Sequence, residues 1–256
     1  MSATERSTQV TNGKQENHLS SHPNGKLIIL GLKRPQRNDK QVFENVFPEN
    51  DLGRILRGLL IEFLIKQEPR IGWARKSACD ERTLTEHPIE TVASHQWGVA
   101  KLIMVLTREP RFHLELPKFD TVKAYEMAII HDVAELKTGD ITPADGVSVA
   151  EKHKAESEAM KEILGSFPNY ISQSLTEVYD RYENRACPES KFVKDCDKLD
   201  FMINAFLLER QGFSGFAEFY SNTIAGGFST RIALDLARVL VQTRNLLEER
   251  QELFRN

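Results

Sequence analysis

The run HDVAELKTGD at residues 131–140 places several potential metal ligands close together. His131 and Asp132 supply an imidazole and a carboxylate, two common protein ligands of divalent metal ions. Glu135 follows His131 by four residues and Asp132 by three, so on a helix the three side chains would share one face. This spacing predicts a cation site with an acidic side chain beside it.

His95 and Asp197 are the candidates to complete such a site. His95 is in register with the apolar face of a predicted helix at 89–107, and Asp197 lies in a predicted helix at 188–210. Each has an ordinary alternative, because a buried histidine is often only hydrogen-bonded and Asp197 could pair with a nearby lysine. Together, two imidazoles and two carboxylates from three helices predict a cation that offsets the cost of burying them.

Helical periodicity covers most of the chain after residue 50. The predicted helices, with their expected caps, are one that begins at Asp51 (its expected cap) and is stopped by Pro69, then 89–107, 120–135 (Asp120), 148–164 (Ser148 with Glu151), one that opens at Ser174, 188–210 and 230–254. Residues expected on their inward faces include Ile55, Leu56, Leu59, Leu60, Phe63 and Leu64, then Val92, Val99, Leu102, Ile103 and Leu106, then Tyr125, Ala128, Ile129 and Ala134. No strand pattern of comparable strength is present, so the sequence predicts an all-α fold.

Composition divides the chain into two parts and excludes several classes of protein. Residues 1–50 are polar and aperiodic, and we expect a largely disordered N-terminal tail and linker before a helical domain at 51–256. The net charge of -3 and the lack of a basic stripe argue against a nucleic-acid partner. The three cysteines form no CxxC pair, and no apolar run is long enough for a membrane span. We expect a cytoplasmic protein, with the nucleus as the alternative compartment.

The pattern H…HD…D resembles the HD-domain metal-dependent phosphohydrolases. The segments PRIGW, ETVASH, HDVAELKTGDITP, EKHKAESEAM and FVKDCDKLD resemble, in the same order, segments of the small HD-domain 5'-deoxynucleotidases, over roughly residues 51–209. The resemblance implies an all-α HD-domain helical bundle, usually a homodimer. It also implies hydrolysis of deoxyribonucleoside 5'-monophosphates to deoxyribonucleoside and phosphate, with a divalent metal cation as cofactor and a small-molecule nucleotide as substrate.

The resemblance also assigns residues to roles. His95, His131, Asp132 and Asp197 match the ligands of the main cation, and Glu135 and Asp140 match the catalytic acidic pair, which some members use with the carbonyl of Ile141 to hold a second cation. Trp73 and Arg75, with Arg70 as an alternative to Arg75, match a substrate-binding segment, and Lys194 could contact the phosphate. Structural alternatives remain: a core position for Trp73, a solvated loop for Arg75, an ion pair with Asp197 for Lys194, and surface positions for Glu135 and Asp140.

This sequence departs from the family pattern at two places. Ser94 stands before the first ligand, where the family usually has an acid, and the loop between Trp73 and Glu90 is longer than usual. The first change removes a carboxylate that could support the ligand. The second leaves the substrate preference open.

Two other functions stay open. One is an HD phosphohydrolase that acts on a deoxynucleoside triphosphate, a cyclic nucleotide or an alarmone, and the other is a non-catalytic, metal-binding regulatory module. The remaining histidines, His18, His22, His87, His113 and His153, fall in the tail, in loops or in a charged stretch, which disfavours a multi-histidine metal pair. Mixed histidine and aspartate ligation does not distinguish Mn, Co, Fe, Ni and Zn, and suits Mg less well.

Overall fold

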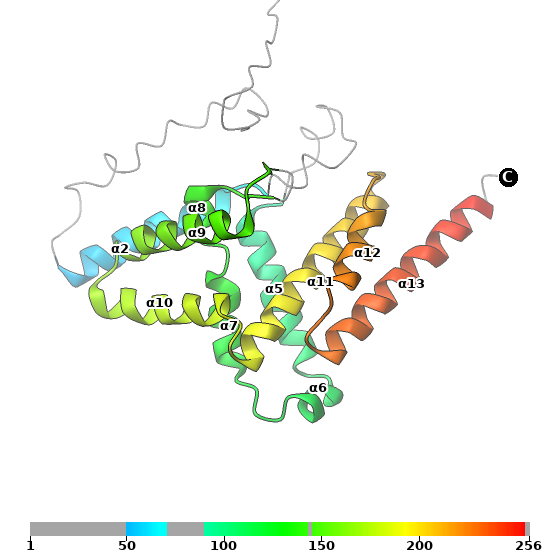
Figure 1. Ribbon diagram of the computed structural model, residues 1–256, viewed down its shortest axis with the longest axis horizontal. Coiled ribbons are helices and arrows are strands. Elements are labelled where there is room, and N and C mark those ends of the chain that lie inside the picture. The colour runs from blue at the N-terminus through cyan, green and yellow to red at the C-terminus, as the bar shows by residue number, and fades with distance from the viewer. Residues whose placement is uncertain (1–49, 71–89, 143–144, 254–256) are drawn as a thin grey trace, which may run out of the picture. The chain divides into compact units, whose positions relative to one another are not determined.

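The computed structural model describes residues 50–70, 90–142 and 145–253. Its helices are α2 (Asp51–Glu62), the 3-10 helix η1 (Phe63–Gln67), α5 (Val92–Leu106), α6 (Pro110–Glu115), α7 (Thr121–Ile130), α8 (Glu135–Thr138), α9 (Val149–Leu164), α10 (Asn169–Glu183), α11 (Pro188–Arg210), α12 (Ala217–Ala225) and α13 (Arg231–Leu253) (Figure 1). These ranges contain no β-strand beyond one isolated bridge between Pro69 and Thr91, which confirms the all-α prediction.

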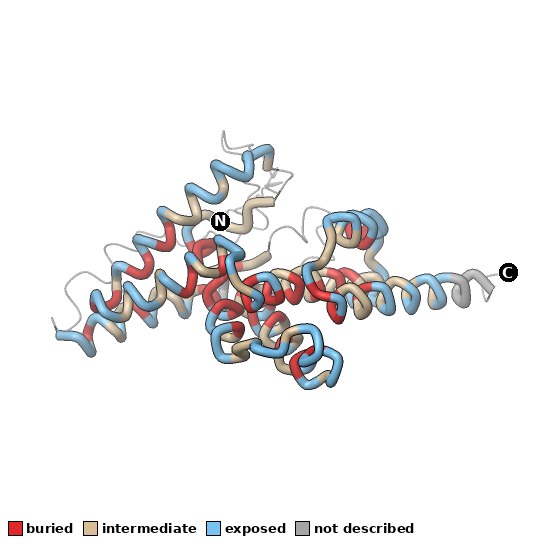
Figure 2. Tube along the Cα trace, turned by 60° about the horizontal axis from the view of Figure 1, so that its bottom comes forward, coloured by how far each residue is buried: buried red, intermediate tan, exposed pale blue. Residues whose placement is uncertain are grey.

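The long helix α11 is the centre of this part of the chain. It packs against α5, α7, α10, α12 and α13, and α5 also packs against α7. Buried residues are dense along α5, α7 and α11, whereas residues 238–248 of α13 are exposed or half-buried (Figure 2). Val99, Ile103, Leu199 and Met202 are fully buried where α5 meets α11. The three helices that carry the candidate ligands are therefore held by the main hydrophobic core.

Several helix boundaries follow the predicted capping signals. Asp120 accepts hydrogen bonds from the backbone N–H groups of Val122 and Lys123, and Ser148 with Glu151 forms the expected capping box. The start of α2 at Asp51 was predicted correctly but its cap was not, because Asn50 is the capping residue and Asp51 is the first helical residue. The predicted start of α10 was wrong, because this helix begins at Asn169, five residues before the predicted Ser174. The short helices α6 and α12 were not predicted.

The inward face of α5 was predicted correctly, and so was that of α7 except at Ile129, but the inward face of α2 was not. Val92, Val99, Ile103 and Leu106 are buried. On α2 and η1, the large apolar side chains Leu56, Leu59, Leu60 and Phe63 are exposed, and so is Ile129 on α7. Helix α2 packs instead through Gly58, where a side chain would overlap the ring of Phe167. Periodicity finds an apolar face, but the close approach at a glycine decides which face is buried.

Helix α7 ends earlier than its pattern predicts. The predicted single helix through Glu135 is instead α7, a turn at residues 131–134 and the short helix α8. In the turn, the N–H groups of Val133 and Glu135 donate to the carbonyls of Ile130 and Asp132, three residues back, so the backbone is wound more tightly than an α-helix. Gly139, with φ of 70°, then ends α8. His131 and Asp132 consequently lie at a helix end.

The N-terminus of α13 is fixed by two acidic residues from other helices. Asp195 accepts from the backbone N–H groups of Ser229 and Thr230, and Glu115 accepts from those of Arg231 and Ile232. These bonds satisfy the N–H groups that a helix start leaves without partners.

Across the described ranges, no helix is both long enough and apolar enough to cross a membrane.

Candidate metal centre

Hydrogen bonds on the far side of each ring fix the orientation of His95 and His131. Nδ1 of His95 lies 2.6 Å from Oδ2 of Asp200, and Nδ1 of His131 lies 2.9 Å from the carbonyl oxygen of Ala128. A carboxylate and a carbonyl are acceptors, so Nδ1 carries the hydrogen in both rings. In the neutral imidazoles, Nε2 is then the nitrogen with a free lone pair, which is the form that binds a metal.

The two Nε2 atoms point at each other and at two carboxylates. They lie 3.3 Å apart, and Nε2 of His95 lies 3.1 Å from Oδ1 of Asp197 and 3.5 Å from Oδ2 of Asp132. Nε2 of His131 lies 3.3 Å from the same Asp132 oxygen. Ligands about 2.1 Å from one cation lie roughly 3.0–3.4 Å from each other. This donor set therefore fits a divalent cation.

Without a cation, such a group of acceptors needs another positive charge. Burial alone would lower the pKa of His95, but its hydrogen bonds with Asp197 and Asp200 outweigh burial and raise the pKa to about 10. A proton on Nε2 of His95 is then shared with Oδ1 of Asp197, 3.1 Å away. Metal binding has to displace that proton.

Asp132 is paired with an arginine. Nη1 of Arg70 donates to Oδ2 of Asp132 at 3.0 Å, and Nε of Arg70 lies 3.9 Å from Glu90. The bridge at Pro69 holds this arginine in place, because the N–H of Arg70 donates to the carbonyl of Glu90 at 2.9 Å. Burial opposes ionisation of Asp132, but the charges of His131 and Arg70 lower its pKa below the ordinary range. The sequence named Arg70 only as an alternative to Arg75, since only the fold brings residue 70 to residue 132.

Asp197 is held between the site and a half-buried lysine. Its Oδ1 faces His95, while its Oδ2 accepts from the ammonium of Lys194. The same ammonium lies 3.4 Å from the hydroxyl of Tyr182, whose ring packs against His131. Burial would raise the pKa of Asp197, but Lys194 and His95 lower it well below its ordinary value. This is the ion pair that the sequence left open beside a phosphate-binding role for Lys194.

Gly98 and Asp200 form a close contact behind His95. A Cβ on Gly98 would overlap Oδ1 of Asp200, so the carboxylate needs a glycine at this position. Asp200 was absent from the sequence-based site, although DKLD places it one turn after Asp197.

Ser94 completes a capping box with Thr91 at the start of α5. The residue that replaces the usual acid therefore has a role in helix capping.

Glu135 is buried beside the cluster, with 4% of its surface exposed. Its Oε2 atom has no hydrogen-bond partner among the described residues. Burial, followed by the charges of Asp132 and Asp140, raises the pKa of Glu135 well above its ordinary value, and Arg70 and Lys152 oppose the shift. Asp140 lies close enough to act electrostatically on both Glu135 and Arg70. The acidic pair is therefore next to the candidate ligands rather than on a remote surface.

Of the remaining candidate site residues, the structure describes Ile141 but not Trp73 or Arg75. The carbonyl of Ile141 accepts a hydrogen bond from Lys152 at 2.8 Å. Trp73 and Arg75 lie outside the described residues, so the structure gives no position for them.

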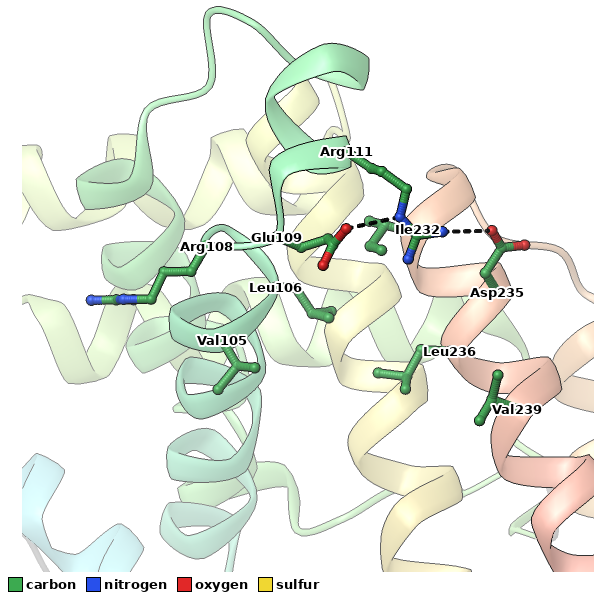
Figure 3. A pocket seen from close by; sticks show the side chains of 9 residues that line it. All are labelled: Val105, Leu106, Arg108, Glu109, Arg111, Ile232, Asp235, Leu236 and Val239. Atoms are coloured by element: carbon green, nitrogen blue, oxygen red, sulfur yellow. Dashed lines mark hydrogen bonds and ion pairs between the residues drawn. The ribbon is translucent and has the colours of Figure 1, made fainter.

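A separate cavity lies away from this cluster. It has a volume of about 470 Å³ and lies between the end of α5, the start of α6 and α13 (Figure 3). Its floor includes Leu106 and Leu236, and on its rim Arg111 forms ion pairs with Glu109 and Asp235. None of the candidate metal ligands lines it.

Comparison with known proteins agrees with this fold. The family model described as "HD domain" matches residues 64–239. The mouse (Mus musculus) 5'-deoxynucleotidase HDDC2 is 33% identical over 193 residues, which cover 75% of this chain and 88% of that protein. The Saccharomyces cerevisiae 5'-deoxynucleotidase YGK1 is 29% identical over 233 residues, which cover 89% of this chain and 90% of that protein.

Solved structures show the same fold. A conserved hypothetical protein from Pyrococcus furiosus superposes with a TM-score of 0.58 at 27% identity, and the match covers 74% of this chain and 99% of that one. The matched family region contains every residue of the metal cluster. The chain therefore belongs to the HD domain family and, within it, to the group that includes the HDDC2 proteins.

Proposed function

We propose that this protein hydrolyses deoxyribonucleoside 5'-monophosphates to deoxyribonucleoside and phosphate, with a divalent cation held by His95, His131, Asp132 and Asp197. The proposal is supported by relatives named 5'-deoxynucleotidases that match most of the chain. The observation that carries it is the convergence of two imidazole nitrogens with free lone pairs on two carboxylates, beside a buried acid with an oxygen that has no partner among the described residues.

The bound cation would supply Lewis-acid chemistry, by lowering the pKa of water and polarising a phosphoryl oxygen. Glu135 is assigned the proton transfer. Its buried Oε2 is free of other hydrogen bonds among the described residues, and burial raises its pKa, which makes its carboxylate a stronger base than an ordinary glutamate. Asp140, its neighbour, is assigned to the sugar hydroxyl or to the proton of the leaving oxygen.

Phosphate binding is assigned first to Arg70. Its guanidinium is at the edge of the cluster, on Asp132, and can present further N–H groups to an approaching dianion. Lys194 is assigned to the orientation of Asp197, because its ammonium already bonds that carboxylate and the hydroxyl of Tyr182. Trp73 and Arg75 remain proposed contacts for the sugar and phosphate on the basis of sequence alone.

The wider proposal includes a homodimer located in the cytoplasm, with a small nucleotide as the partner and no nucleic acid or membrane. The family resemblance supports the dimer, the net charge of -3 argues against a nucleic-acid partner, and the lack of a long apolar run argues against a membrane. The ion is proposed to be one of Mn, Co, Fe, Ni, Zn or Mg, since the mixed nitrogen and oxygen ligands accept all of these.

Hydrolysis of a nucleotide panel, with the nucleoside, nucleotide and phosphate products separated by chromatography, tests the function. The panel contains dAMP, dGMP, dCMP, dUMP and dTMP, their ribonucleotides, dATP, a cyclic nucleotide and an alarmone, each with the candidate metals. We expect turnover of the deoxynucleoside monophosphates, slower turnover of the ribonucleotides and none with Asp132→Ala. Preference for dATP, the cyclic nucleotide or the alarmone would point to another HD phosphohydrolase. Metal binding without any turnover would point to a regulatory module.

A further inference from the structure

The carbonyl of Ile141 has a cationic partner from the chain itself. Nζ of Lys152 donates to this oxygen at 2.8 Å and lies 3.5 Å from Oε1 of Glu156. The family resemblance assigns the same carbonyl, together with Glu135 and Asp140, to a second divalent cation. The residues present do not fit that cation well, because a positive charge already stands at one of its three expected ligands.

Backbone contacts on both sides fix the position of Lys152. The capping box of Ser148 and Glu151 starts α9 and places Lys152 in its first turn. The segment that carries the Ile141 carbonyl is held by Asp145, whose Oδ2 accepts from the N–H and the hydroxyl of Thr142 at 2.8 and 3.0 Å. The contact between ammonium and carbonyl therefore joins two defined elements.

Electrostatics disfavour a second cation at this carbonyl. A divalent ion bound to the Ile141 oxygen would lie about 2.1–2.4 Å from it, and so within roughly 5 Å of the Lys152 ammonium. Like charges at that separation repel, and the repulsion is larger in a partly buried site than in bulk water. The lysine side chain is 37% exposed and Glu156 15%, so water only partly screens this region.

We propose that Lys152 acts as a built-in cation beside Glu135 and Asp140, so that each chain binds one divalent cation and the ammonium takes the place of a second. Lys152 is also a positioning residue, because its bond to Ile141 anchors the segment that carries Asp140. This inference rests on the metal centre proposed above, but it concerns how many cations bind and is measured without any reaction.

Counting bound Mn²⁺ on the full-length protein tests the inference. The protein is freed of metal with a chelator, titrated with MnCl₂, and the free ion is measured by electron paramagnetic resonance. Wild type should bind one Mn²⁺ per chain tightly. Lys152→Met, which keeps a similar length and removes the charge, should bind two, with affinity at the second site raised about tenfold or more.

Three variants make the result specific. Lys154→Met removes an exposed charge two residues further along α9 and should bind one Mn²⁺, as wild type does. Lys152→Arg retains the charge and should also bind one. Lys152→Gln provides a second neutral variant if Lys152→Met does not fold. A circular dichroism spectrum like that of wild type, together with one tightly bound Mn²⁺ at the main site, shows that a variant is folded.

The inference is overturned if wild type binds two Mn²⁺ with similar affinity, if neither neutral variant gains a site, or if Lys154→Met gains one as well. The proposed activity could fail in the nucleotide assay while these stoichiometries hold, and the reverse is also possible. The two failures are therefore distinguishable.

Discussion

Nδ1 of His95 lies 2.6 Å from Oδ2 of Asp200, so a carboxylate from α11 sets which nitrogen of this ring faces the candidate metal. This second carboxylate on α11 lies one turn beyond Asp197, which faces the other nitrogen of the same ring. Helix α11 thus supplies both a candidate ligand, Asp197, and the carboxylate of Asp200, which orients the candidate ligand His95.

Asp200→Asn should weaken metal binding by about 10–100-fold, the usual effect of losing a partner that orients a metal-binding histidine. Gly98→Ala should have a similar effect without changing any polar group, because its new methyl would displace the Asp200 carboxylate. Isothermal titration calorimetry with Mn²⁺ measures the metal affinity of both variants. Ala100→Ser, on the same helix, is the control, and equal affinities in all four proteins would contradict the positioning role.

His131→Ala and Asp132→Ala should each lose bound metal together with phosphate release from dAMP. Both side chains contribute an atom within 3.5 Å of Nε2 of His95, so removing either leaves an incomplete ligand set. Elemental analysis after gel filtration gives the metal content. Retention of full metal content and full turnover by either variant would show that the ligand assignment is wrong.

Glu135→Gln should keep the cation but reduce kcat for dAMP by about a hundredfold or more, the usual contribution of a positioned acid or base. The amide fills the same space and cannot accept the proton. Glu158→Gln on α9 is a matched surface control, because Glu158 is exposed. Unchanged kcat in Glu135→Gln would assign its buried carboxyl to structure alone.

Arg70→Lys should raise KM for dAMP by about tenfold with a smaller change in kcat. Lysine keeps the charge, but it cannot present the planar pair of N–H groups that suits a phosphate. Because Arg70 also contacts Asp132, metal content must be measured in the same preparation. Arg108→Lys, which lies at the end of α5 beside the separate cavity, should match wild type. A loss of metal with unchanged KM in the remaining active fraction would limit Arg70 to supporting Asp132.

Chelation should lower the melting temperature by about 5–10 °C. A cation at about a hundred times its Kd stabilises by about 2.7 kcal/mol, and for a domain of this size 1 kcal/mol corresponds to about 2–4 °C. Adding Mn²⁺ should restore the value, and Asp132→Ala should respond to neither treatment. Differential scanning fluorimetry gives the comparison, and an equal response of wild type and Asp132→Ala would mean that the ion acts elsewhere.

The sequence by itself determined the helical class, most helix starts and the four candidate ligands, because these depend on local signals. Asp120 and Ser148 cap helices through contacts a few residues away, and the apolar spacing that buries His95 lies within α5. His131 and Asp132 are adjacent in the chain, and their chemistry is visible without a fold.

Only the tertiary structure decided what depends on contacts between distant segments. The pairs Arg70 with Asp132 and His95 with Asp200 are 62 and 105 residues apart, so no local pattern could reveal them. The outward face of α2 and the tight turn after α7 likewise depend on packing and backbone geometry that override periodicity. Lys152 belongs to a charged stretch that reads as a solvated helix face, and only the folded loop brings the Ile141 carbonyl to its ammonium.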